Sequence, residues 1–245
     1  MTPQKHIAMW TCARSRSTLM TRAFQQLDGC FIFDEPFYPP YLARQGLDHP
    51  HRLEIIQQYE TNYERVVSKI TGSLPQGYSF SFQKHTANNL PENLNLEWLM
   101  GLDNFFLIRH PSEIIVSRQN IYNYRKIFTL HEIGLEDLYN LFIFIEKQTN
   151  KVPLVVDSTD LVKNPSKVLQ RLCTQLGVSF SEKMLTWPPG IRETDPIWAK
   201  TWYGTIVNSS EFIPFTQQKV YVPEHLKAVL EECLPFYEKL HQYAL

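Results

Sequence analysis

The segment IAMWTCARSRSTLMTRAF, residues 7–24, joins an apolar run, a polar turn and a helical pattern in immediate succession. The run IAMW (7–10) predicts a strand covered on both faces, because nearly all of it is apolar. Apolar residues at helical spacing then predict a helix over 17–27. The turn between them, TCARSRST (11–18), places two arginines among hydroxyl residues. Arginines this close repel each other unless an anion lies between them, so the segment predicts an anion site.

The same alternation of apolar runs and helical patterns continues along the chain. Four further runs predict strands: CFIF (30–33), YSFSF (78–82), NFFLI (104–108) and PLVV (153–156). Strands separated by helices imply right-handed crossovers, a parallel sheet and ligands at the carboxyl ends of the strands. The predicted fold class is therefore α/β, a three-layer parallel sheet with helices on both faces.

The helical patterns between the runs are marked by their caps. We expect one helix over 52–70, with Leu53, Ile56 and Tyr59 among the residues of its buried side. Pro111 and Pro165 each suit a first helical turn; Asn164 is a good cap for the second helix and Gly177 a good stop. The last helix, about 223–242, is interrupted by Pro235 and is expected to kink there.

The composition limits the class of protein. The 245 residues suit a single domain, 1–245, with a C-terminal helix and a Trp- and Pro-rich segment at about 186–216 that we interpret as a functional loop. Lys plus Arg is 24 and Asp plus Glu is 25, without basic clusters, which argues against a nucleic-acid partner. Four scattered cysteines and the absence of a long apolar stretch or signal-like start predict a cytoplasmic protein that has reduced thiols and no membrane partner.

The turn 11–18 differs from the common phosphate-binding loop. The pattern GxxxxGK[ST] is absent, and Ser17 stands where its lysine belongs, while Thr18 can occupy the hydroxyl position. Such a loop suits a phosphate-like group without the lysine and magnesium chemistry of a kinase. The alternative is a helix start with a Ser/Thr cap and two solvated arginines.

A second stretch offers the same kind of chemistry. FFLIRHPSEIIVSRQ (105–119) places Arg109 at the carboxyl end of a strand and Ser117 eight residues later, in a helix opened by Pro111. An arginine offers two parallel donors to a phosphate, and a serine hydroxyl can complete the contact. The alternative is an ion pair of Arg109 with Glu113.

Together, RSRST (14–18) and RHPSEIIVS (109–117) resemble, in this order, two motifs of the sulfotransferases that use 3′-phosphoadenylyl sulfate (PAPS). Further stretches, among them DEPFY (34–38) and QKHTANNL (83–90), look like a bacterial subgroup of that family. The resemblance implies a P-loop nucleotide-binding architecture. It also implies that PAPS is the co-substrate, with no metal. Arg16 stands where many members have glycine.

The resemblance also implies roles for individual residues. Its first motif assigns the 5′-phosphosulfate to five residues, with Arg14 also contacting the sulfuryl group that is transferred: Arg14, Ser15, Arg16, Ser17 and Thr18. The 3′-phosphate is assigned to Arg109 and Ser117. Arg192 is added by position alone, because better-known members contribute a basic residue from their C-terminal part.

Two residues at strand ends are candidates for the base that takes the acceptor's proton. His85 follows Lys84, and a histidine near its ordinary pKa is suited to general-base work. Glu35 follows the second strand, and as a base it would need burial to raise its pKa. We favour His85, with Glu35 as an orienting residue or alternative base. A histidine hydrogen-bonded to a loop and a carboxylate capping the turn at Pro36 are the structural alternatives.

The predicted function is therefore sulfuryl transfer from PAPS to a hydroxyl or amine of a small-molecule acceptor. Two alternatives stay open. One is a P-loop kinase that acts on small molecules with ATP and magnesium, which the missing glycine–lysine pair disfavours. The other is a nucleotide-binding protein without turnover, which Arg16 in place of glycine keeps open. Acceptor pockets consist of ordinary apolar residues, so neither the acceptor nor the oligomeric state follows from the sequence.

Overall fold

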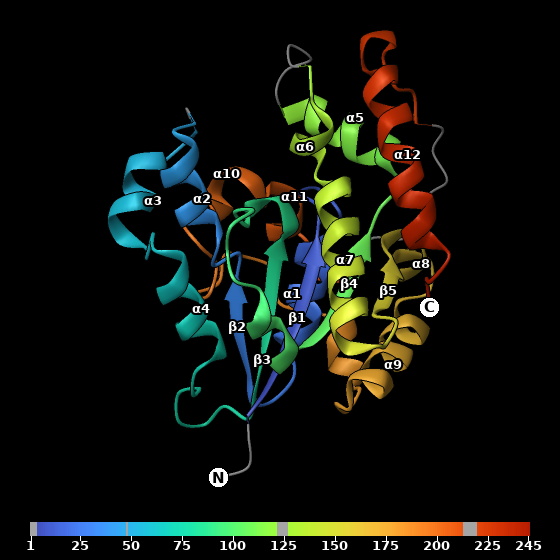
Figure 1. The fold of residues 1–245 in the computed structure, drawn as a ribbon. Helices are drawn as coiled ribbons and strands as arrows, with labels where there is room; N and C mark the ends of the chain where they lie inside the picture. The colour runs from blue at the N-terminus through green and yellow to red at the C-terminus, as the bar shows by residue number, and fades with distance from the viewer. Residues whose placement is uncertain (1–3, 48, 122–126, 213–219) are drawn as a thin grey trace.

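The computed structural model describes residues 4–47, 49–121, 127–212 and 220–245. Within these residues the strands form a five-stranded sheet in the order β2-β3-β1-β4-β5, and each neighbouring pair is parallel. The strands are β1 (Lys5–Thr11), β2 (Cys30–Asp34), β3 (Phe80–Thr86), β4 (Asp103–Ile108) and β5 (Leu154–Asp157). The central strand is β1, with β3 on one side and β4 on the other (Figure 1). The carboxyl end of β1 is thus the switch point at which open α/β sheets bind ligands.

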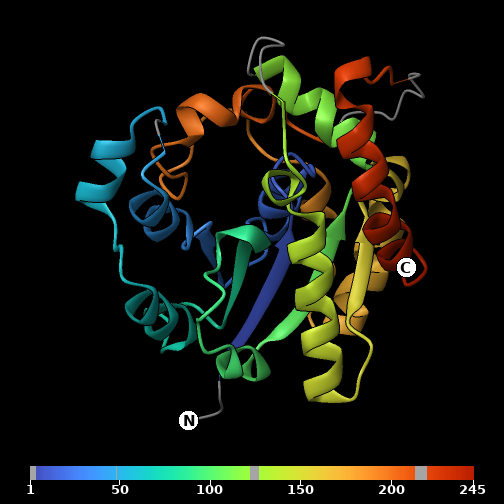
Figure 2. The ribbon, with the colours of Figure 1, turned by 45° about the horizontal axis from the view of Figure 1, so that its top comes forward.

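Helices cover both faces of this sheet, which confirms the predicted three-layer fold (Figures 1 and 2). One face packs on α1 (Ser17–Phe24) and α9 (Pro165–Leu176). The other packs on α5 (Pro111–Ile121), α7 (Leu135–Thr149) and α12 (Lys227–His241). The remaining α-helices are α2 (Tyr38–Gln45), α3 (Arg52–Gln58), α4 (Tyr63–Thr71), α6 (Leu130–Ile133), α8 (Ser158–Lys163), α10 (Ala199–Trp202) and α11 (Gly204–Val207). Short 3-10 helices are η1 (Ala87–Asn89), η2 (Glu97–Gly101), η3 (Glu182–Leu185) and η4 (Glu224–Leu226).

The central strand explains why its sequence is a continuous apolar run. Ile7 and Met9 pack into the cluster under α1 and α9, whereas Ala8 and Trp10 pack into the cluster under α5, α7 and α12. All four side chains are fully buried. A strand covered on both faces has no solvent-facing side that would favour polar residues. The four cysteines are also buried and form no disulfide. None of the described helices has the length and apolar character needed to cross a membrane.

The helix predicted over 52–70 is wrong, because the chain forms two helices there. Tyr59 is extended after α3, and the Asn62 side chain then caps α4 by accepting a hydrogen bond from the Arg65 N–H at 2.9 Å. The expected buried side is also wrong, since Leu53 is 69% exposed and Ile55 is fully buried. The Asn62 cap forms a new helix start inside a continuous apolar pattern.

One other helix signal behaves differently from expectation. The Asn164 side chain makes no capping hydrogen bond, although Pro165 opens α9 as predicted. The last helix begins at Lys227 and its assigned span continues through Pro235 to His241. Gly177 ends α9 in the left-handed conformation, as predicted.

The aromatic segment predicted at about 186–216 is described as far as residue 212. It contains α10 and α11, which lie between α2 and α5 near the carboxyl ends of the strands (Figures 1 and 2). Trp187 and Trp198 are 3% and 2% exposed, so they form the packed underside of the segment. Residues 213–216 lie outside the described residues.

The break between α3 and α4 makes a prediction about stability. Replacing Asn62 by alanine removes the side-chain cap at the start of α4 and should lower the free energy of unfolding by about 1 kcal/mol. Urea unfolding followed by far-UV circular dichroism measures this difference. Asn93→Ala, at an exposed position outside any helix, is the matched control. Equal unfolding midpoints for the two variants would contradict the role of the cap.

Candidate active site

The loop between β1 and α1 has an unusual backbone. Arg14 and Arg16 adopt the left-handed conformation, with φ of 72° and 64°, in which side chains are strained and glycine is not. Arg16 is the N-cap of α1, and no side chain caps the helix start. The Ser/Thr cap of the alternative interpretation is therefore absent, while Ser17 and Thr18 lie in the first turn. The first N–H groups of a helix have no partner within it, so this turn presents donors suited to an anion.

Two side-chain donor atoms of the loop are buried and lack a partner among the described residues. Arg16 uses Nη2 for an ion pair with Glu113 Oε2 at 2.7 Å. Its Nη1 is buried and has no hydrogen-bond partner in the described part of the chain, and the same holds for Ser15 Oγ. Ser15 is fully buried. Buried donors without partners are costly, and an anion bound in the loop would satisfy them.

The two sequence motifs lie in direct contact. Arg14 Nε donates to Ser117 Oγ at 3.1 Å, and Arg109 Nη1 donates to the Arg14 carbonyl at 2.7 Å. Arg109 Nε also donates to Glu113 Oε2 at 2.8 Å, so the ion pair considered as the alternative is present as well. Burial lowers the pKa of Arg109, and the positive charge of Arg16 lowers that pKa further. Three guanidinium groups therefore lie around the loop, and one carboxylate bridges two of them.

A buried network of charges lies next to the loop. Lys84 Nζ lies 2.8 Å from Asp34 Oδ1, 3.0 Å from Glu35 Oε1 and 2.6 Å from the Tyr203 hydroxyl. It also donates to Thr18 Oγ1 at 3.4 Å, which links the network to α1. Burial alone would lower the pKa of Lys84, but the two carboxylates outweigh burial and raise it.

Glu35 is the member of this network that is nearest to solvent. Its side chain is 16% exposed, against 2% for Asp34 and 1% for Lys84. Burial and the neighbouring Asp34 raise its pKa, while Lys84 and Arg14 oppose the rise. Its backbone is left-handed at φ 52°, and its N–H extends the strand pairing by donating to the Lys84 carbonyl at 2.9 Å. Glu35 therefore combines a raised pKa with access to the loop.

The structure places His85 on the opposite face of β3. Successive residues of a strand point to opposite faces, so Lys84 faces α1 while His85 stacks on Trp10 with 4.5 Å between ring centroids. The imidazole is fully buried, and Nε2 is hydrogen-bonded to Gln83 Oε1. Burial lowers its pKa to about 3. The expected base thus lies in the apolar core and not beside Glu35 and the loop.

Arg192 is also placed apart from Arg109 and Ser117. Its side chain bonds the Pro188 carbonyl, and its backbone N–H donates to Asp195 Oδ2 at 2.8 Å. Asp195 in turn accepts two hydrogen bonds of 2.7 Å from Arg22, an ion pair with side chains only 1% and 2% exposed. Arg192 therefore lies beside the ion pair that joins the aromatic segment to α1.

Sequence reasoning missed three residues of the site, Lys84, Asp34 and Tyr203. A lysine that closely follows the strand pattern YSFSF (78–82), at the carboxyl end of a strand, was the available signal for Lys84, because a buried ammonium requires partners. The role of Tyr203 had no local signal, since its hydroxyl donates to Asp34 at 2.9 Å from 169 residues away. Chemically, the site offers cations and backbone donors for an anion, with a carboxylate of raised pKa beside them.

Comparison with known protein families agrees with the resemblance seen in the sequence. A family model described as a sulfotransferase domain matches residues 5–244. Two curated relatives from Arabidopsis thaliana, named branched-chain-amino-acid aminotransferase-like proteins 2 and 1, are 31% and 30% identical over 96% and 97% of the chain. The match covers 41% and 42% of those relatives, so the chain spans about two-fifths of their length. Their names describe these longer proteins.

Solved structures of sulfotransferases share the fold. The sulfotransferase domain from the curacin biosynthetic pathway has a TM-score of 0.58 at 17% identity, covering 95% of this chain and 96% of that one. A sulfotransferase from Alicyclobacillus acidocaldarius has a TM-score of 0.53 at 12% identity, over 99% and 95% of the two chains. Mouse sulfotransferase SULT7A1, solved in complex with PAP, has a TM-score of 0.51 at 11% identity, over 98% and 89%.

From the left-handed backbone at Arg16 we predict a difference in stability that separates the effect of backbone strain from the effect of the lost ion pair. Arg16→Ala and Arg16→Gly both remove the ion pair with Glu113, but only glycine relieves the strained conformation. The glycine variant should therefore be more stable than the alanine variant by about 1 kcal/mol. Urea unfolding of the two variants measures this difference. If alanine proves as stable as glycine, the left-handed conformation of this position is contradicted.

Proposed function

Because the chain belongs to the sulfotransferase domain family, we propose that it transfers a sulfuryl group from PAPS to a hydroxyl or amine of a small-molecule acceptor. The observation that carries the proposal is the contact between the two motifs, in which Arg109 and Ser117 of the second motif both bond Arg14 of the first. A nucleotide with a phosphate at each end requires two anion sites at a fixed separation. Direct hydrogen bonds between the motifs hold them in such an arrangement.

The loop residues bind and position the donor. Helix-start N–H groups, Ser15, Ser17 and Thr18 are suited to the 5′-phosphosulfate, and the buried Nη1 of Arg16 supplies a further donor. Arg109 and Ser117 are suited to the 3′-phosphate. Arg14 belongs to the loop and is hydrogen-bonded to both Arg109 and Ser117. It is the residue that would contact the sulfuryl oxygens, where negative charge develops during transfer.

Glu35 takes the role of the base in this proposal. In the transfer, the acceptor oxygen forms a bond to sulfur, the bond from sulfur to the bridging oxygen breaks, and its electron pair stays on the departing phosphate. The acceptor's proton passes to the Glu35 carboxylate. Lys84, which lies 3.0 Å from Glu35 and 3.4 Å from Thr18, positions the carboxylate beside the helix start. His85, stacked in the core, is not part of this step.

The loop geometry bears on the alternative of a protein that binds a nucleotide without turnover. That alternative rested on Arg16 in place of glycine, but Arg16 adopts the backbone conformation that glycine favours, and its side chain turns to Glu113. This geometry supports a loop whose backbone keeps the conformation that glycine favours, although arginine stands at position 16.

Selective loss of one phosphate contact tests the donor assignment. Arg109→Ala should weaken binding of adenosine 3′,5′-bisphosphate about ten- to a hundred-fold, because a charge-assisted hydrogen bond is lost. Binding of adenylyl sulfate, which lacks the 3′-phosphate, should change little. Ser117→Ala should show the same selectivity at smaller size. Titration calorimetry measures both nucleotides; equal losses for the two would mean that Arg109 only supports the loop through the Arg14 carbonyl.

The pH dependence of kcat/KM tests the base. A base must be ionised, so activity should rise with pH through the pKa of Glu35, which lies above its ordinary value because of burial and Asp34. Glu35→Gln should lower kcat about 10²–10⁴-fold and remove this rise. His85→Asn should keep it. The opposite pattern, with the rise lost in His85→Asn and kept in Glu35→Gln, would restore His85 as the base.

A further inference from the structure

Tyr203 is a residue of the buried network to which the proposed transfer assigns no role. It lies between α10 and α11 in the aromatic segment and is 5% exposed. Its hydroxyl accepts a hydrogen bond from Lys84 Nζ at 2.6 Å and donates to the carboxylate of Asp34, with 2.9 Å to each oxygen. The ammonium group also lies 4.6 Å from the centroid of the Tyr203 ring. The hydroxyl therefore contacts the ammonium group and one of its two carboxylates at the same time.

The Tyr203 hydroxyl keeps its proton in this setting. Burial raises its pKa, and the negative charges of Asp34 and Glu35 raise that pKa further. Asp195, which also belongs to the aromatic segment, acts in the same direction. A phenol has one proton and donates one hydrogen bond, which here goes to Asp34.

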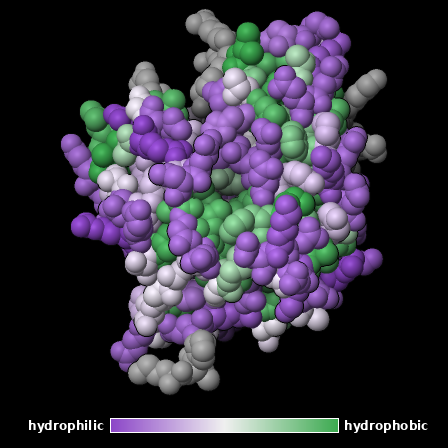
Figure 3. All heavy atoms as spheres, viewed as in Figure 1, coloured by the Kyte–Doolittle hydropathy of each residue, from purple (hydrophilic) through white to green (hydrophobic). Residues whose placement is uncertain are grey.

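The charges of this network lie in the interior and are unequal in number. Hydrophilic side chains form most of the face seen in Figure 3, and water screens charges at such a surface. The Lys84 network is buried and is screened much less. It holds two carboxylates, Asp34 and Glu35, for one ammonium group, and Arg14 is a further cation that acts on Glu35. Two carboxylates this close in a buried setting favour the uptake of one proton by the pair.

The hydrogen bonds of the network decide which carboxylate takes this proton. Asp34 accepts from the Tyr203 hydroxyl and lies 2.8 Å from Lys84 Nζ, whereas Glu35 lies 3.0 Å from the same ammonium group. The single proton of the hydroxyl is engaged by Asp34 and is not available to Glu35. Hydrogen bonds donated to a carboxylate favour its ionised form. The bond from Tyr203 therefore favours the charge on Asp34 and leaves the proton to Glu35.

We propose that the Tyr203 hydroxyl keeps Asp34 ionised, so that the proton of the carboxylate pair is bound and released at Glu35. Tyr203 is thus a positioning residue, which acts on the base through Asp34. The inference rests on the proposed function, because it explains which of the two carboxylates serves that transfer as the base. No bond is formed or broken at Tyr203, which keeps its proton throughout.

This role connects the base to the position of the aromatic segment. The residue before Tyr203 is Trp202, whose carbonyl accepts a hydrogen bond from Arg14 Nη1 at 3.1 Å. Two consecutive residues of the segment therefore contact the arginine assigned to the sulfuryl group and the network that holds Glu35. The placement of the segment that orients Arg14 is thus also the placement in which Glu35 serves as the base.

Carbon-13 NMR of the carboxyl groups tests this inference on the chain without any ligand. With labelled aspartate and glutamate, the carboxyl signals of Asp34 and Glu35 are assigned from Asp34→Asn and Glu35→Gln and followed against pH. In the wild type, the Glu35 signal should move with pH while the Asp34 signal stays nearly constant over the same range. In Tyr203→Phe, the share of the proton carried by Asp34 relative to Glu35 should rise about ten- to a hundred-fold, because a hydrogen bond to a charged group is lost.

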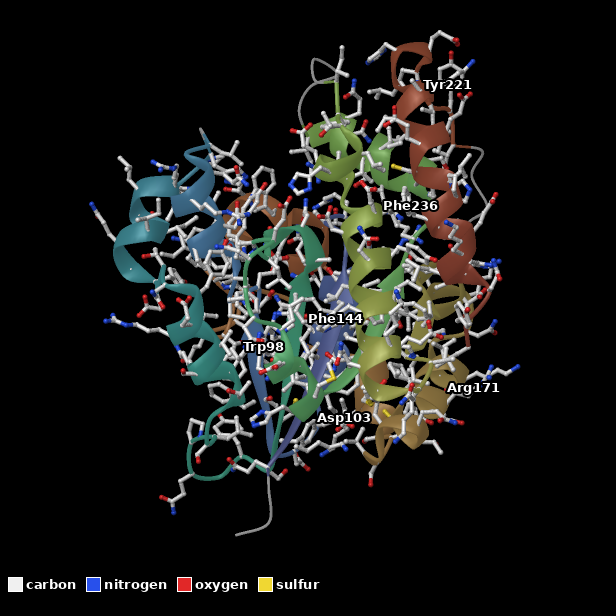
Figure 4. The ribbon with its side chains drawn as sticks, in the orientation of Figure 1. Trp98, Asp103, Phe144, Arg171, Tyr221 and Phe236 are labelled. Carbon is white, nitrogen blue, oxygen red and sulfur yellow. The ribbon has the colours of Figure 1, made fainter. Side chains whose placement is uncertain are left out.

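Tyr237→Phe is the matched control. The Tyr237 hydroxyl donates to Asp157 Oδ2 at 2.8 Å, so this variant also removes a hydrogen bond from a phenol to a carboxylate. Asp157 ends β5, at the edge of the sheet opposite to β2, which ends at Asp34. Figure 4 labels the neighbouring residue Phe236 on α12, and Figure 1 shows this helix on the β5 side of the sheet. The signals of Asp34 and Glu35 should therefore be the same in Tyr237→Phe as in the wild type.

Three results would overturn the inference. In the wild type, the Asp34 signal moves together with that of Glu35; in Tyr203→Phe, both signals behave as in the wild type; or Tyr237→Phe changes them as much as Tyr203→Phe does. The first result needs no variant, so the inference can be tested even if Tyr203→Phe does not fold. The titration also needs neither donor nor acceptor. A chain that titrates as expected but transfers no sulfuryl group would contradict the proposed function, whereas a chain that transfers it while Asp34 titrates with Glu35 would contradict the role of Tyr203.

Discussion

The arrangement of the site depends on one buried ammonium group, that of Lys84. It joins the end of β2 through Asp34 and Glu35, the first turn of α1 through Thr18, and the aromatic segment through Tyr203. Two carboxylates at the end of one strand would repel each other in a buried setting, and the ammonium group makes their proximity favourable. Removing one partner of a buried ion pair leaves an uncompensated charge that costs about 3–5 kcal/mol. The position of Glu35 therefore follows from Lys84.

Polar contacts also fix the aromatic segment over the loop. Besides Tyr203, the carbonyl of Trp202 accepts a hydrogen bond from Arg14 Nη1 at 3.1 Å. Further along the segment, Asp195 holds Arg22 of α1 in a bidentate pair that is almost fully buried. Buried pairs of this kind cost desolvation, and their directional geometry favours one placement of the segment. Residues distant in sequence thereby set where the loop arginines lie, which prepares the site before a ligand binds.

The sequence predicted the parts of the fold that depend on local patterns. Continuous apolar runs identified the parallel strands, and the turn 11–18 and the Arg109 stretch, placed at strand ends, were found in contact because such ends share one edge of a sheet. The features that the sequence did not predict are of two kinds. Some depend on which face of a strand a residue points to, and others depend on partners that are distant in sequence. His85 and Lys84 are neighbours, but the alternation along β3 sends one to the core and the other to the site. Within 52–70 a single capping side chain outweighed a continuous helical pattern.

Charge balance distinguishes the arginines of the loop from one another. Arg16 and Arg109 share the Glu113 carboxylate, so each already has an ionic partner. Arg14 bonds to a serine hydroxyl and a backbone carbonyl, both neutral. If Arg14 exchanges a neutral acceptor for an anionic oxygen, its hydrogen bond becomes stronger. If Arg16 or Arg109 turned to a new anion, it would first lose its ionic hydrogen bond to the Glu113 carboxylate. Arg14 is therefore the arginine of this loop whose contacts change most favourably when negative charge develops beside it, and its neutral partners hold it in place until then.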